Sequence, residues 1–193
     1  MSKNYLAYTL LVFATLCWSG NFIVGKFAYL FEVPPLTLNF LRWVSVWLLL
    51  IPFTYKEIYY NWEHIKKNWI VISFMGVITI STFNSVVYFA LTHTQVINAV
   101  LVLAAIPAVT IIISSLMKVD KTNILQLIGL LLSVIGISAI ISNADLKKIF
   151  SLSFNKGDLW MLICVLSWSL YSTLLKKHKF NFSQFTLIQL MVS

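Results

Sequence analysis

The sequence is short of charged residues. Only 14 of its 193 residues are Lys or Arg and six are Asp or Glu, so 10% of the chain is charged, whereas soluble domains carry roughly 25%. Hydrophobic residues make up 60% of the chain, and the mean hydropathy is +0.88. A water-soluble fold of this composition would lack the polar residues that cover a surface. We therefore expect an integral membrane protein in contact with the lipid bilayer.

Residue patterns that carry catalysis or bind metals are also scarce. The two cysteines, Cys17 and Cys164, lie inside apolar runs, and the sequence has no Cys-x-x-Cys spacing, so neither a metal ion nor a cofactor is expected. A membrane enzyme would need a nucleophile with a base, paired carboxylates or metal ligands at depth. The sequence shows no such set, so it does not predict an enzyme.

The net charge of +8 does not predict a nucleic-acid partner. The basic residues form short clusters between apolar runs, which is where membrane proteins keep their cytoplasmic anchors. They form no continuous basic face that could follow a phosphate backbone.

The apolar runs predict six membrane spans and the start of a seventh. Residues 68–117 contain no Asp, Glu, Lys or Arg and would form a helix of about 75 Å, far longer than a bilayer core of about 30 Å. The chain must therefore turn within this run, and the polar residues 92–95 are the best place. The predicted spans are the run between Lys3 and Lys26, then about 36–55, 69–91, 96–117, 123–142 and 158–175, with a seventh helix from about 184.

Lys and Arg also predict the orientation of the chain. With a cytoplasmic N-terminus, nine lysines fall on the cytoplasmic side and five basic residues fall outside, which favours this orientation by the positive-inside rule. The segment 143–156 places three lysines on the opposite side. We expect a multi-pass protein of a bacterial inner membrane with its N-terminus in the cytoplasm.

Two stretches of the sequence resemble each other. Residues 16–26 read LCWSGNFIVGK and residues 166–176 read LSWSLYSTLLK, so Trp18 and Trp168 lie 150 positions apart. Thr-Leu pairs before the second and seventh predicted spans extend the match. The offset contains five spans, an odd number, so the second copy would enter the membrane from the opposite side. Such inverted repeats are typical of secondary transporters, which bind their substrate between the two halves.

The sequence also resembles the EamA-like family of the drug/metabolite transporter superfamily. The run 90–141 has the family's order of features, namely Ala90-Leu91, Thr94, Pro107, Asp120, Gly129 and Gly136. Residues 18–22 and Arg42 are similar to the family's first and second helices. Asp120 stands where glutamate is more usual. The resemblance implies an all-α membrane fold with a complete five-helix repeat at 6–142, a connecting loop at 143–157 and an incomplete second repeat at 158–193.

The resemblance implies that a full-length relative is a carrier with ten helices. The resemblance therefore implies a secondary transporter that moves a small-molecule metabolite by alternating access and that is incomplete as an isolated chain. The alternative is a non-transporting fragment or a half-size subunit that needs a partner chain. That partner would be a second copy or the missing half-repeat. No Asp or Glu lies deep within the predicted spans, which favours a neutral or zwitterionic substrate.

Polar residues inside apolar helices are costly and usually face protein or water, so they are the candidates for a substrate cavity. Trp18 and Asn21 share one face of the first span, and Trp168 and Tyr171 occupy the corresponding face of the sixth. The alternatives are an interfacial anchor for Trp18 and a helix–helix hydrogen bond for Asn21. On the third span the second candidate face consists of Ser81, Asn84 and Tyr88.

Arg42, with Asn39 one turn before it, is the clearest charge inside an apolar run. It could hold a carboxylate or phosphate through two parallel hydrogen bonds, or it could extend to the headgroups. Gly129, Ser133 and Gly136 lie on one face of the fifth span and predict close helix packing. Pro107 predicts a kink or hinge in the fourth span.

Overall fold

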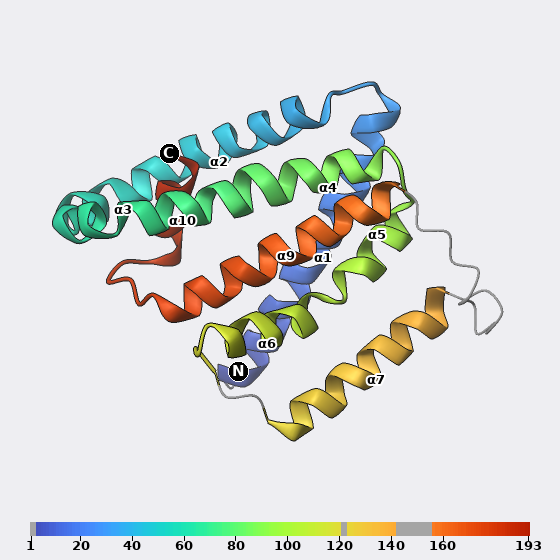
Figure 1. Cartoon of the computed structure of the whole chain (residues 1–193). Coiled ribbons are helices and arrows are strands. Elements are labelled where there is room, and N and C mark those ends of the chain that lie inside the picture. The colour runs from blue at the N-terminus through green and yellow to red at the C-terminus, as the bar shows by residue number, and fades with distance from the viewer. Residues whose placement is uncertain (1–2, 121–122, 142–155) are drawn as a thin grey trace.

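The computed structural model describes residues 3–120, 123–141 and 156–193. Every regular element in this part of the chain is helical (Figure 1). The elements are α1 (Lys3–Leu30), α2 (Pro35–Tyr60), α3 (Trp62–Gly76), the π-helix η1 (Val77–Phe83), α4 (Asn84–Leu91), α5 (Val96–Leu103), α6 (Ile106–Leu116), α7 (Ile124–Ile141), α9 (Lys156–Lys177) and α10 (Gln184–Val192).

The helices confirm the predicted all-α membrane fold. Among the described residues, five helical stretches are long and apolar enough to cross a bilayer, namely Tyr5–Leu30, Pro35–Tyr60, Trp62–Leu91, Val96–Leu116 and Lys156–Lys177. They correspond to predicted spans one to four and six. Helix α7 covers the fifth prediction in 18 residues, and α10 is the nine-residue start of the seventh. The connecting loop predicted at 143–157 lies largely outside the described residues.

The fourth span is broken in its middle. Helix α5 ends at Leu103, and α6 begins at Ile106 with Pro107 in its first turn. Proline has no N–H to offer the preceding turn, and its ring clashes with the carbonyl four residues before it. The break therefore falls where Pro107 predicts a kink. Whether it also acts as a hinge stays a prediction.

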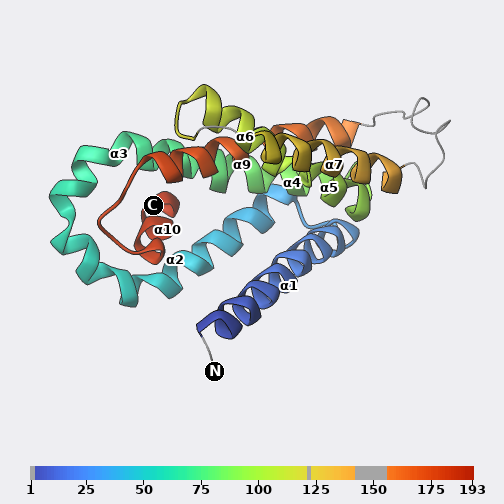
Figure 2. The ribbon, with the colours of Figure 1, turned by 90° about the horizontal axis from the view of Figure 1, so that it is seen from below.

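Helices that are distant in sequence run antiparallel to each other in pairs. Lys26, near the end of α1, and Asp158, near the start of α9, both bond to Thr94, while Trp18 and Trp168 stack near the middle of the two helices. Likewise, Glu57 near the end of α2 bonds to Ser183, the residue before α10. Figure 2 shows α10 lying within the curve formed by α2 and α3. These directions are those that an inverted repeat would produce.

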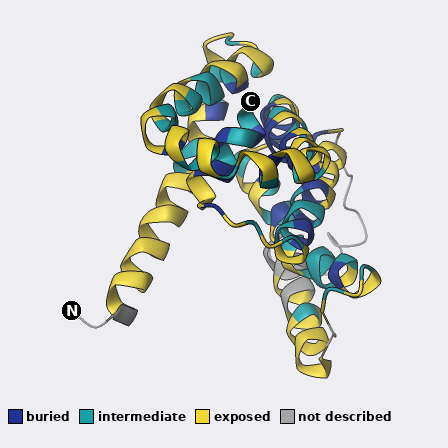
Figure 3. Ribbon diagram, turned by 90° about the vertical axis from the view of Figure 1, so that its left-hand side faces the viewer, coloured by how far each residue is buried: buried dark blue, intermediate teal, exposed yellow. Residues whose placement is uncertain are grey.

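Two buried clusters hold the bundle together. One joins α4, α5 and α9 around Val87, Leu91 and Met161. The other joins α3, η1 and α10 around Met75, Ile80 and Leu187. The N-terminal half of α1 lies outside both clusters and is exposed (Figure 3). Phe83 of the first cluster and Ile80 and Met191 of the second also line the cavity described below.

In the described part of the chain, no neighbouring atom lies close to either glycine of the predicted packing face on α7. Gly129 and Gly136 are exposed, and a Cβ at either position would meet nothing within 4 Å. The side chain of Ser133 lies outside the described residues. A stripe of small residues allows a close helix contact but does not specify which helix makes it. The close glycine contacts occur elsewhere, at Gly25 against Tyr88 and at Gly76 against the backbone of Met191.

Candidate functional site

Arg42 on α2 points into the bundle and joins three helices. Its Nη1 donates to Asn21 Oδ1 on α1 at 2.5 Å and to the Tyr88 hydroxyl on α4 at 2.6 Å. Its Nη2 donates to Asn84 Oδ1. The Tyr88 hydroxyl also donates to Asn21 Oδ1 at 2.6 Å. The structure therefore brings Asn21, Arg42, Asn84 and Tyr88 together, and it shows Arg42 bonded within the protein rather than extended to the headgroups.

The π-helix η1 sets the direction of Asn84. The side-chain amide nitrogen of Asn84 donates to the carbonyl oxygen of Thr79, five residues earlier, at 2.7 Å. A π-helical segment has a wider turn than an α-helix, and such segments occur frequently at functional sites. The side chain of Asn84 is thereby fixed with its oxygen toward Arg42. Gly25 adds to this arrangement, because a Cβ there would lie 2.7 Å from the Tyr88 ring.

Aromatic rings from both stretches of the sequence repeat form a wall beside Arg42. The rings of Trp18 and Trp168 stack with centroids 5.7 Å apart. Trp168 also contacts Phe83 at 4.7 Å and Tyr171 at 5.5 Å. Aromatic contacts of this kind contribute about 0.5–1.5 kcal/mol each beyond the area that they bury. Trp18 is 42% exposed, so part of its ring is available to a further group.

Asn21, Arg42 and Asn84 line the same cavity as the aromatic wall, and we call it the Arg42 cavity. Its volume is about 370 Å³, and it lies between α1, α2, η1, α4, α9 and α10. Its lining residues are Cys17, Trp18, Asn21, Arg42, Trp43, Thr79, Ile80, Phe83, Asn84, Trp168, Tyr171, Ile188 and Met191. A mostly apolar hollow with a few converging polar groups is the usual form of a small-molecule site.

Three predicted site residues do not line this cavity, namely Asn39, Ser81 and Tyr88. Tyr88 nevertheless accepts a hydrogen bond from Arg42. Ser81 is exposed and lines a separate hollow of about 360 Å³ together with Asn39 and Ser85. Ser81 therefore lines a different hollow from Asn84, and a contact of Ser81 with the substrate stays a prediction. Asn39 is 7% exposed and donates to the Ile80 carbonyl at 3.0 Å and to Ser85 Oγ at 2.9 Å, which fixes α2 against η1 and α4.

Polar contacts connect the helices at both ends of the bundle. At one end, Lys26 Nζ donates to the carbonyls of Leu91 and Thr94 at 2.7 and 3.2 Å. At the other end, Lys176 pairs with Asp120 at 2.7 Å. The Lys176 ammonium, followed by the Ser114 hydroxyl, holds the pKa of the Asp120 carboxyl below its ordinary value.

Glu57 forms a further contact at this second end. It accepts bonds from the backbone N–H and hydroxyl of Ser183 at 2.8 and 2.5 Å, and from the hydroxyl of Thr186. This contact anchors the N-terminus of α10 to α2. The sequence offered no signal for it, since Glu57 lies at the polar edge of a predicted span, 126 residues from Ser183.

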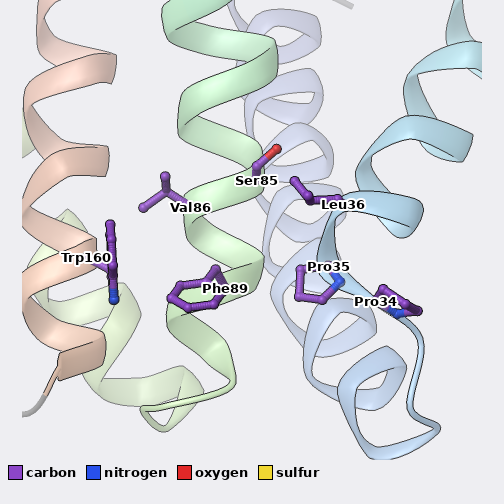
Figure 4. A pocket seen from close by; sticks show the side chains of 7 residues that line it. All are labelled: Pro34, Pro35, Leu36, Ser85, Val86, Phe89 and Trp160. Carbon is purple, nitrogen blue, oxygen red and sulfur yellow. The ribbon is translucent and has the colours of Figure 1, made fainter.

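A further hollow is an apolar groove of about 500 Å³ between α2, α4 and α9. Figure 4 shows its lining residues Pro34, Pro35, Leu36, Ser85, Val86, Phe89 and Trp160. Ser85 supplies its one side-chain hydroxyl, and none of these residues is charged. The groove therefore cannot orient a polar solute as the Arg42 cavity can.

Several lining residues of the Arg42 cavity were not predicted. Cys17 and Trp43 adjoin the predicted Trp18 and Arg42, and helical periodicity alone did not place them on the cavity side. Phe83 and Thr79 lie in or beside the π-helical turn, whose register the sequence does not reveal. Ile188 and Met191 come from α10, and as apolar residues in an apolar helix they gave no sign of a site in the sequence.

Comparison with known proteins supports a membrane carrier. Residues 5–142 match the EamA-like transporter family. Over 112 residues the chain is 27% identical to a protein named "Uncharacterized transporter YyaM" from Bacillus subtilis (strain 168). That match covers 58% of this chain and 37% of the relative. No solved structure gives a significant match.

Proposed function

Because the chain belongs to the EamA-like transporter family, we propose that it is a secondary transporter that moves a small metabolite through the Arg42 cavity. The observation that carries this proposal is the meeting of Trp18 and Trp168, 150 residues apart in sequence, in the lining of one cavity. Inverted-repeat carriers bind their substrate at such a junction.

The proposed mechanism is alternating access, in which one repeat rocks against the other around the bound substrate. The contacts at the two ends of the bundle then serve as gates. Opening one end separates Lys26 from the carbonyls of α4 and its following turn. Opening the other separates Asp120 from Lys176. Exposed ion pairs of this type contribute only about 0–1 kcal/mol, so such a gate can open at low cost.

We also propose a bacterial inner membrane as the location, with the N-terminus in the cytoplasm. The distribution of lysines supports this orientation. In that case the Asp120–Lys176 and Glu57–Ser183 contacts close the cytoplasmic end, and the contacts of Lys26 close the outer end. We also propose, as the partner of this chain, a second copy or the missing half of the second repeat. The exposed glycines of α7 are a surface against which it could pack.

An efflux experiment that presents many solutes at once tests the transport proposal. Proteoliposomes are loaded with the small-molecule extract of the host cell, and the external buffer is followed by mass spectrometry. We expect at least one solute to leave faster than from liposomes without protein. Equal release of every solute from the two preparations would contradict transport.

A further inference from the structure

We propose that Arg42 binds a carboxylate of the transported solute, and that the solute is a small organic monoanion with a flat apolar group. The inference rests on the proposed function, because it assigns the substrate class of the same cavity. It goes beyond that function in assigning one charged group and one shape to the ligand. It also replaces the neutral or zwitterionic substrate that the sequence favoured, because Arg42 lies in the cavity lining.

The charge of Arg42 is not balanced by the protein part of the cavity that the structure describes. Its hydrogen-bond partners Asn21, Asn84 and Tyr88 are neutral, and no Asp or Glu lines the cavity. A charge removed from water is costly unless it is paired. A ligand carrying one negative charge would supply the missing counter-charge, whereas a cationic ligand would meet an uncompensated repulsion.

The hydrogen bonds of the guanidinium leave one edge for a ligand. Both hydrogens of Nη1 are used, by Asn21 and Tyr88, and one hydrogen of Nη2 is used by Asn84. Nε–H and the second hydrogen of Nη2 have no acceptor among the described residues. Nε–H and an Nη2–H form the side edge of a guanidinium, whose two parallel donors match the two oxygens of a carboxylate. We therefore place the ligand carboxylate at this edge. The three neutral partners hold the group in place for this contact.

The remainder of the lining fits a flat apolar group. The stacked rings of Trp18 and Trp168 and the nearby Tyr171 present aromatic surface in the same cavity as Arg42. A planar ligand group can stack on or pack edge-on against such rings. The volume of about 370 Å³ limits the ligand to a small molecule, since drug-sized ligands occupy pockets of about 300–1,000 Å³.

Four probes with one benzyl or phenyl body and different end groups test the assignment. They are phenylacetate, its neutral amide phenylacetamide, the cation phenethylammonium, and phenyl phosphate. Binding to the purified protein is measured by titration calorimetry at pH 7. Phenylacetate is expected to bind at least about 10-fold more tightly than phenylacetamide, because bonds to a charged partner are roughly twice as strong as neutral ones.

The other two probes distinguish a carboxylate ligand from a cationic ligand and from a phosphate. Phenethylammonium is expected to show no binding at concentrations where phenylacetate saturates. Tighter binding of phenyl phosphate than of phenylacetate would overturn the carboxylate assignment in favour of a phosphate. Equal affinities for the acid and its amide, or binding by none of the four probes, would also overturn it.

Substitutions then locate the contact. Arg42→Gln is expected to remove the preference for phenylacetate over its amide, and Arg42→Lys to retain only part of it, because lysine keeps the charge but not the fork of two parallel N–H groups. Lys56→Gln, on the exposed end of the same helix, is the matched control and should leave the preference unchanged. If Arg42→Gln fails to fold, the probe series on the unaltered protein still decides the question.

The outcome is separable from that of the transport proposal. Efflux from proteoliposomes without any preference for a carboxylate probe would overturn the assignment of Arg42 and leave transport standing. Selective carboxylate binding without efflux of any solute would support the assignment and contradict transport.

Discussion

Replacing Gly76 by valine is expected to lower the free energy of unfolding by about 3 kcal/mol, the upper part of the range for overpacked sites. Gly76 ends α3 where it crosses α10. A Cβ there would lie 2.5 Å from the carbonyl oxygen of Met191 and 3.2 Å from its Cα. These are backbone atoms, so no change of side-chain rotamer can relieve the clash. Helix α10 must move, and the buried cluster around Met75 and Leu187 is disturbed with it.

Thermal unfolding of the purified protein in detergent measures this effect. Gly129→Val is the matched control, because it makes the same change in a helix where a Cβ would meet nothing within 4 Å. Valine has a better helix propensity than glycine by a few tenths of a kcal/mol, so this control should unfold at the same temperature or slightly higher. Equal stability of the Gly76→Val protein and the unaltered protein would contradict the close approach of α3 and α10.

Replacing Trp168 by alanine is expected to lower solute efflux at least 10-fold. Trp168 contacts Trp18, Phe83 and Tyr171, so its removal takes away the ring that joins the two halves of the aromatic wall. Truncation of a large aromatic side chain in a packed site costs about 3–5 kcal/mol. The efflux rate is therefore normalised to the amount of monodisperse protein after gel filtration.

Trp160→Ala provides the control for the same helix. Trp160 is exposed and lines the apolar groove rather than the Arg42 cavity (Figure 4), so its loss should change the efflux rate less than twofold. If both substitutions lowered efflux equally, the Arg42 cavity would have no special role in the solute's path.

The sequence predicted the helices well because one strong physical rule governs them. A bilayer requires about 20 apolar residues per crossing, and the few charges and prolines of this chain mark where the crossings end. The break before Pro107 follows from the chemistry of that one residue. The antiparallel arrangement of α1 and α9 agrees with the odd number of spans between the two Trp-Ser pairs.

The predictions for the site were less complete, because side-chain partners depend on tertiary structure. Helical periodicity placed Trp18 and Asn21 on one face, and the structure gives both to the Arg42 cavity. The same reasoning placed Ser81 beside Asn84, whereas Ser81 lines the neighbouring hollow. The sequence did not reveal that this stretch is the π-helix η1. Whether Arg42 faced lipid headgroups or the bundle could not be decided before its partners on α1 and α4 were known.

Helix–helix contacts were also hard to predict from the sequence, as the small residues of α7 show. Gly129 and Gly136 have the spacing of a helix contact, yet neither meets a neighbour among the described residues. Gly76 approaches another helix more closely, and in α3 only Ser73 is a small residue at helical spacing from it. A glycine permits a close contact, and the opposing helix decides whether the contact forms.

Labelling of Cys17 from each side of the membrane tests the central claim most directly. Cys17 lines the Arg42 cavity, whereas the other cysteine, Cys164, is fully buried. A membrane-impermeant thiol reagent is applied to right-side-out and to inside-out vesicles, with Cys17→Ser as the control. Alternating access predicts labelling of Cys17 from both sides and none in the control. Labelling from only one side, or from neither, would contradict a cavity that opens alternately to the two faces of the membrane.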